Sequence, residues 1–111
     1  MMRAWLWPVW CVALAATAAH ADDIFSVAPE LWDRPRGARM VREQTAVAQA
    51  VRLALSRPAA RLVIHHGFGQ EPLLYAEELR AWLMALAVDG ARISLVSDTK
   101  VNEALRIEVT P

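Results

Sequence analysis

The sequence predicts an α/β (α+β) fold, a two-layer sandwich in which two helices cover one face of a mixed sheet. Two observations support this prediction. Residues 39–56 and 73–87 have the 3.6-residue period of amphipathic helices, and they alternate with short apolar runs at 61–66 and 93–96 that are typical of strands. The chain then ends on alternating apolar and charged residues at 105–109. With one more strand ahead of the first helix, the element order is β-α-β-α-β-β, and helices between strands imply right-handed parallel crossovers.

The N-terminal segment has the composition of a secretory signal peptide. A basic start, Met1-Met2-Arg3, is followed by an apolar run at 4–18 and by Ala19-His20-Ala21, which has the A-x-A form of a cleavage site. The run is shorter than the roughly 20 residues that a spanning helix needs. We therefore expect residues 1–21 to be a signal peptide cleaved after Ala21, and membrane contact to be limited to that segment.

The remaining 90 residues are enough for one small domain with a thin core. They carry a net charge of −1, which leaves no basic surface for nucleic acid. The one cysteine, Cys11, lies in the expected signal peptide, so a disulfide framework is excluded.

The first half of the domain is expected to contain a lead-in, a strand and a helix. Residues 22–29 have no helical period and are expected to be a lead-in segment, extended around Ile24 and Phe25. The first strand is placed at 30–33, and the domain is taken to span 30–111. The helix at 39–56 is ended by Pro58.

The second half supplies a strand, the longer helix and two final strands. Residues 61–66 form a nearly continuous apolar run, as in a strand covered on both faces. Pro72 fits the first position of the next helix. The polar stretch at 97–103 separates the last two strands, which are close enough in the chain that they could form a hairpin.

Three segments resemble the OmpA-like C-terminal domain family. They are LWDRPRGARM at 31–40, RLVIHHG at 61–67 and WLMALAVDGARISLV at 82–96. The last is similar to the family's end of helix two, which leads through a Gly-Ile and an Arg-Ile pair into the next strand. The resemblance covers 30–109. It implies a periplasmic domain of a Gram-negative bacterium that binds peptidoglycan non-covalently.

The resemblance also says which positions would hold the ligand. In the family, an Asp after the central strand and an Arg on helix two grip the diaminopimelate group of the peptide stem, through charge-assisted contacts. Alignment on Ile64 puts Phe68 in the place of the Asp, and alignment from Ala87 and Arg92 puts Tyr75 in the place of the Arg. The family's site is therefore altered in this chain.

Four residues are candidates for ligand binding. His66 stands at the carboxyl end of a central strand, a favoured place for ligands. Phe68 and Tyr75 would form an aromatic wall for a sugar or peptide. Core packing and loop anchoring are the more ordinary roles for both residues. Arg80 would grip a carboxylate, although a solvated pair with Glu77 is the more ordinary role.

No metal, cofactor or enzymatic activity is predicted. His65 and His66 are adjacent in a strand and face opposite ways, so they do not chelate one ion easily. Glu77-Glu78 is a pair on a helix surface and not an acid–base couple in a cleft.

Three functions follow from the sequence. The first is a non-enzymatic periplasmic binding module of the cell envelope, which contacts peptidoglycan weakly or binds an envelope protein. The second is an accessory subunit of an envelope assembly, with no ligand of its own. The third is a His-based binder of a metal or small molecule.

Overall fold

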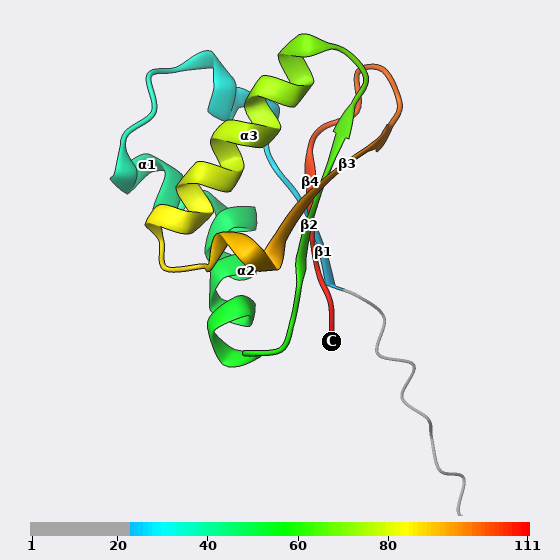
Figure 1. Cartoon of the computed structure of the whole chain (residues 1–111). Helices are drawn as coiled ribbons and strands as arrows, with labels where there is room; N and C mark the ends of the chain where they lie inside the picture. The colour runs from blue at the N-terminus through cyan, green and yellow to red at the C-terminus, as the bar shows by residue number, and fades with distance from the viewer. Residues whose placement is uncertain (1–22) are drawn as a thin grey trace, which may run out of the picture.

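The structure is a computed structural model that describes residues 23–111. Helices form one layer and a twisted sheet the other (Figure 1). The elements, in chain order, are β1 (Asp23–Ser26), η1 (Pro29–Asp33), α1 (Ala38–Glu43), α2 (Thr45–Ser56), β2 (Leu62–Gly67), α3 (Gln70–Ala85), η2 (Gly90–Arg92), β3 (Ile93–Thr99) and β4 (Arg106–Val109), where η marks a 3₁₀ helix. The predicted signal peptide at 1–21 lies outside the described residues. Among residues 23–111, no helix is long and apolar enough to cross a membrane.

The sheet is mixed, as predicted, and its strand order is β1-β4-β2-β3. β2 and β3 are parallel, and β4 runs antiparallel to both of its neighbours, β1 and β2. The last two strands do not form a hairpin, which the sequence had allowed, because β4 inserts between β1 and β2. The loop from β3 to β4 must therefore cross the carboxyl end of β2.

The first strand is not at 30–33. Those residues belong to η1, and the strand is β1, inside the segment expected to be a lead-in. Asp23 pairs with Val109 and Ser26 with Arg106, so β1 is an edge strand of the sheet. The folded unit thus begins before position 30. Four residues with one half-buried apolar side chain, Phe25, carry too little periodic signal to mark a strand without its partner.

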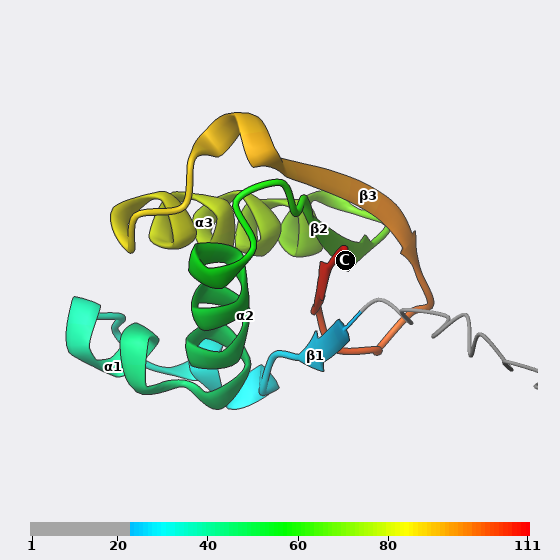
Figure 2. The same cartoon turned by 90° about the horizontal axis from the view of Figure 1, so that it is seen from below.

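The helices pack against one face of the sheet, and Figure 2 shows them on one side with β1 and β3 at the opposite edges. The predicted helix at 39–56 is divided at Gln44, whose backbone is extended. Its side-chain oxygen accepts a hydrogen bond from the Val47 N–H at 3.0 Å and so begins α2. The core between the layers is formed by small and branched residues of α2 and α3 over the strands. It includes Val47, Ala50, Ala54, Leu62, Ile64, Ala76, Leu79, Leu83, Ile107 and Val109.

Arg92 joins the end of α2 to the start of β3. Its Nη2 donates to the carbonyls of Ala54 and Arg57 at 2.9 and 2.7 Å, and its Nε donates to the Ala60 carbonyl at 2.9 Å. One planar guanidinium thereby satisfies three carbonyls around the α2–β2 turn. The Arg-Ile pair that carries the family resemblance has a structural role in this chain.

Candidate functional site

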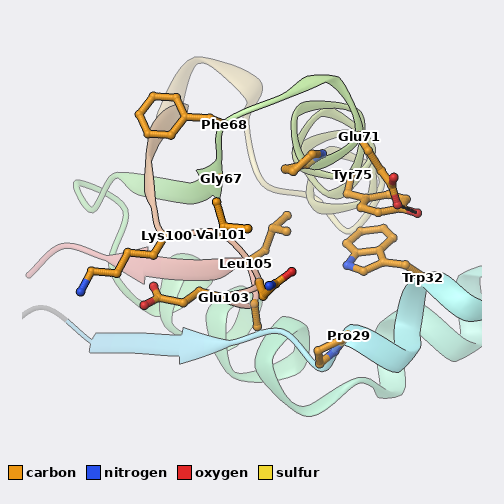
Figure 3. A pocket seen from close by; sticks show the side chains of 13 residues that line it. Pro29, Trp32, Gly67, Phe68, Glu71, Tyr75, Lys100, Val101, Glu103 and Leu105 are labelled. Atoms are coloured by element: carbon orange, nitrogen blue, oxygen red, sulfur yellow. Dashed lines mark hydrogen bonds between the residues drawn. The ribbon is translucent and has the colours of Figure 1, made fainter.

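A pocket of about 370 Å³ opens where β2 ends and α3 begins. Its walls come from η1, the β2–α3 turn, the first turns of α3 and the loop from β3 to β4, which crosses the end of β2 (Figure 3). The lining residues are Pro29, Trp32, Gly67, Phe68, Glu71, Pro72, Tyr75, Lys100, Val101, Asn102, Glu103, Ala104 and Leu105. Most of the lining is apolar, and its charged and amide side chains are Glu71, Lys100, Asn102 and Glu103. This composition is typical of small-ligand sites.

One wall is a stacked aromatic pair. The Trp32 and Tyr75 rings lie 4.7 Å apart between centroids and 12° from parallel. The Tyr75 hydroxyl donates to Glu71 Oε1 at 2.9 Å, and this bond raises the pKa of Tyr75 above its ordinary value. Figure 3 shows Tyr75 over Trp32 with Glu71 beside them. Residues 71 and 75 are one turn apart, so the helix itself brings the carboxylate to the ring.

Arg36 and Glu78 fix the position of Trp32. The Arg36 guanidinium lies 5.3 Å from the Trp32 ring centroid, and its Nη1 donates to the Trp32 carbonyl at 3.2 Å. Arg36 also forms a two-pronged ion pair with Glu78, in which Nη2 donates to Oε1 at 2.9 Å and Nε donates to Oε2. This bidentate geometry ties η1 to α3. The aromatic wall is therefore held in place in the free protein.

Apolar side chains stand at the mouth of the pocket. Phe68 is 76% exposed and Val101 is 82% exposed, which is high for residues of this size. They come from two different segments, the β2–α3 turn and the β3–β4 loop. Burying either ring or branched side chain against a ligand would be favourable, at about 1.5–3 kcal/mol for complete burial.

The structure brings together two of the four predicted site residues, Phe68 and Tyr75. His66 is 5% exposed, and its Nδ1 lies 2.9 Å from the Gly67 carbonyl, so it is a buried residue beneath the site. Arg80 lies near the opposite end of α3, where its Nη2 donates to the Gly90 carbonyl at 3.2 Å. Neither residue lines the pocket.

Trp32, Glu71 and the loop at 100–105 were missed by the sequence prediction. Trp32 packs against the core and also faces the pocket, and the turn-forming residues Asp33, Pro35 and Gly37 that follow it are a signal that it lies at the edge of a layer. The loop belongs to the site because β3 and β4 lie on opposite sides of β2, so the chain between them crosses the end of β2. A sequence pattern does not contain that pairing.

Within residues 23–111, no group of three His, Cys, Asp or Glu side chains is arranged to hold a metal ion. His65 instead lies between two carboxylates. Its Nδ1 is 2.8 Å from Asp98 Oδ2 and its Nε2 is 2.7 Å from Glu108 Oε1. Both ring nitrogens are therefore in hydrogen bonds that a bound metal would have to break. A candidate metal centre is not supported at this position.

Comparison with protein-family models and with curated proteins gives no match for this chain.

Proposed function

We propose that this chain is a non-enzymatic binding module of the cell envelope, and that it contacts peptidoglycan through the pocket between β2 and α3. The observation that supports this most directly is that Phe68 and Tyr75 line one pocket. These are the two positions that align with the ligand-gripping Asp and Arg of the OmpA-like family. The order of helices and strands also agrees with that resemblance, once β1 is taken as the first strand.

The exchange of charged side chains for aromatic ones changes the expected mode of binding. An aromatic wall contacts the apolar faces of sugars and peptide side chains, and it does not grip a carboxylate or an amine as an ion pair would. The charged groups that line the pocket are Glu71 and Glu103, and Lys100 of the opposite sign. We therefore expect weak binding that depends on ring contacts and is only modestly reduced by salt.

Retention on purified sacculi tests this proposal, with Phe68→Ala as the variant. Removal of the exposed ring is expected to weaken retention about fivefold, which corresponds to about 1 kcal/mol. Leu55→Ala is the matched control, because Leu55 is also exposed and apolar but lies near the end of α2. Equal retention of the wild type and Phe68→Ala, or no retention of either, would overturn the proposal.

The exposure of Phe68 and Val101 favours a second candidate function, in which the same mouth docks an envelope protein. A photo-crosslinking amino acid at Phe68 separates the two functions in cells. A discrete protein adduct, formed by a chain that sacculi do not retain, would favour the protein partner. Retention without such an adduct would favour peptidoglycan.

A further inference from the structure

His65 forms a bridge across three strands on the sheet face opposite the helices. It lies on β2, Asp98 on β3 and Glu108 on β4, and we call these three side chains the His65 bridge. The ring Nδ1 is 2.8 and 2.9 Å from the two Asp98 oxygens, and Nε2 is 2.7 Å from Glu108 Oε1. The side chains of His65 and Glu108 are 14% and 19% exposed, so the bridge is partly shielded from water.

The bridge is complete only when the ring carries two protons. A neutral imidazole has one N–H, so it donates to Asp98 or to Glu108 but not to both ionised carboxylates. Arg106 is a further charged group beside His65, since it is the direct partner of His65 across the β2–β4 register. With the ring protonated, two cations balance two carboxylates. After it loses a proton, the two carboxylates share one cation.

Arg106 is an alternative partner for a carboxylate that the neutral His65 ring no longer binds. Its Nε is buried and has no hydrogen-bond acceptor in the described part of the chain. It also contributes to the lowered pKa of Asp98, after the larger effect of the His65 hydrogen bond. The cluster therefore has two alternative pairings, one through the imidazolium and one through the guanidinium.

Each residue of the His65 bridge lies within three positions of a residue that lines the pocket. His65 precedes Gly67 and Phe68 by two and three residues, and Asp98 precedes Lys100 by two. On β4, Glu108 follows Leu105, the last residue of the loop that lines the pocket. β3 is an edge strand that pairs with β2 alone in the described sheet. Side-chain contacts near its end therefore help to fix where the loop begins.

We propose that His65 is a positioning residue for this pocket, whose protonated ring holds the β3–β4 loop against the end of β2. Protonation of the ring completes the bridge and orders the loop at 100–105. Deprotonation releases one carboxylate and loosens that wall. The importance of this for binding rests on the proposed function, whereas the position of the loop is measurable without any ligand.

Amide chemical shifts of the ligand-free, full-length mature chain test the inference between about pH 5 and about pH 8, the range in which histidines titrate. The amides of residues 100–105 are expected to shift with the same midpoint as the His65 ring. Their hydrogen-exchange protection, corrected for the intrinsic rate, is expected to fall about fivefold over that range, as for loss of one charged hydrogen bond in a partly exposed place. If the amide shifts of residues 100–105 do not follow the His65 midpoint, the inference is overturned.

Two variants distinguish a positioning role from a general loss of stability. His65→Gln keeps a polar side chain and removes the titration, so the loop should lose its pH response. Glu77→Gln, on the exposed side of α3, is the control that should keep it. The wild-type titration decides the question even if His65→Gln does not fold. If sacculi do not retain the chain but the loop still responds to pH, the proposed function is wrong and the positioning role of His65 stands.

Discussion

The Asp98 carboxylate is the clearest case of one residue making stability depend on pH. The hydrogen bond from His65 lowers the pKa of Asp98 below its ordinary value. A carboxyl group with a lower pKa in the folded state stabilises the fold above its unfolded pKa, about 3.9 for Asp. That contribution is lost as the pH falls through the folded-state pKa.

We predict that Asp98→Asn lowers the free energy of unfolding at about pH 6, and that the difference from the wild type shrinks at about pH 3. Urea unfolding at the two pH values measures this. Asp33→Asn, which changes an exposed Asp outside the sheet, should show a smaller difference at about pH 6. A difference for Asp98→Asn that is the same at both pH values would contradict the prediction.

Gly69 is the residue whose backbone positions the start of α3. Its φ of 107° and ψ of 167° lie in a region that is essentially restricted to glycine. Gly69→Ala is therefore expected to destabilise the protein by about 1–3 kcal/mol, measured by thermal or urea unfolding. Gly37→Ala is the comparison, because Gly37 has an ordinary φ of −113° and open space around it. A larger loss for Gly37→Ala would argue against this account.

Two of the four candidate residues, Phe68 and Tyr75, line the pocket, and the geometry of helices and strands explains why the other two do not. Tyr75 and Arg80 are five residues apart, which places them about 140° apart around a helix and about 7.5 Å apart along it. They cannot both face one small site near the start of α3. His66 failed for a related reason, since adjacent strand residues face opposite sides and His66 points into the molecule.

At the scale of elements, α3 depends on a narrow buried stripe. Leu83 is fully buried, whereas Leu55 on α2 is 56% exposed. Leu83→Ala is expected to lower the free energy of unfolding by about 2–5 kcal/mol, because it removes apolar contacts and leaves a cavity. Leu55→Ala, the same chemical change at the surface, should cost no more than about 0.5 kcal/mol. Chemical denaturation measures both, and similar losses for the two variants would refute the assigned packing.

The sequence revealed the long elements more reliably than it revealed their pairing. The periods at 39–56 and 73–87 correspond to α1 with α2 and to α3, and the apolar run at 61–66 corresponds to β2. An extended backbone at Ile24 and Phe25 was expected, but not a strand, because these residues become β1 only by pairing with β4, some 80 positions away. The insertion of β4 beside β1 is likewise determined by long-range contacts and not by local sequence. It moved the β3–β4 loop over β2 and created a pocket wall that local patterns do not predict.

For the whole molecule, β1 closes the far edge of the sheet and is part of the folded unit. Val27, just after it, is 1% exposed, and its N–H donates to the Leu105 carbonyl at 2.8 Å. Asp23 Oδ2 accepts a bond from Arg57 Nη1 at 2.9 Å, which links the strand to the end of α2. These contacts join the start of the domain to two separate parts of the chain, so the sheet is not complete without its first strand.

A chain that begins at residue 30 is accordingly predicted to be much less stable than one that begins at residue 22. It loses the half-buried Phe25 and the buried Val27, worth about 1.5–3 kcal/mol each if fully buried, and it leaves β4 as an open edge. The loss is a large part of the roughly 5–15 kcal/mol that stabilises a small domain. Thermal unfolding followed by circular dichroism compares the two chains, with light scattering to detect aggregation through the open edge. Equal unfolding temperatures would mean that the fold is complete without β1, and the domain would then begin near position 30 after all.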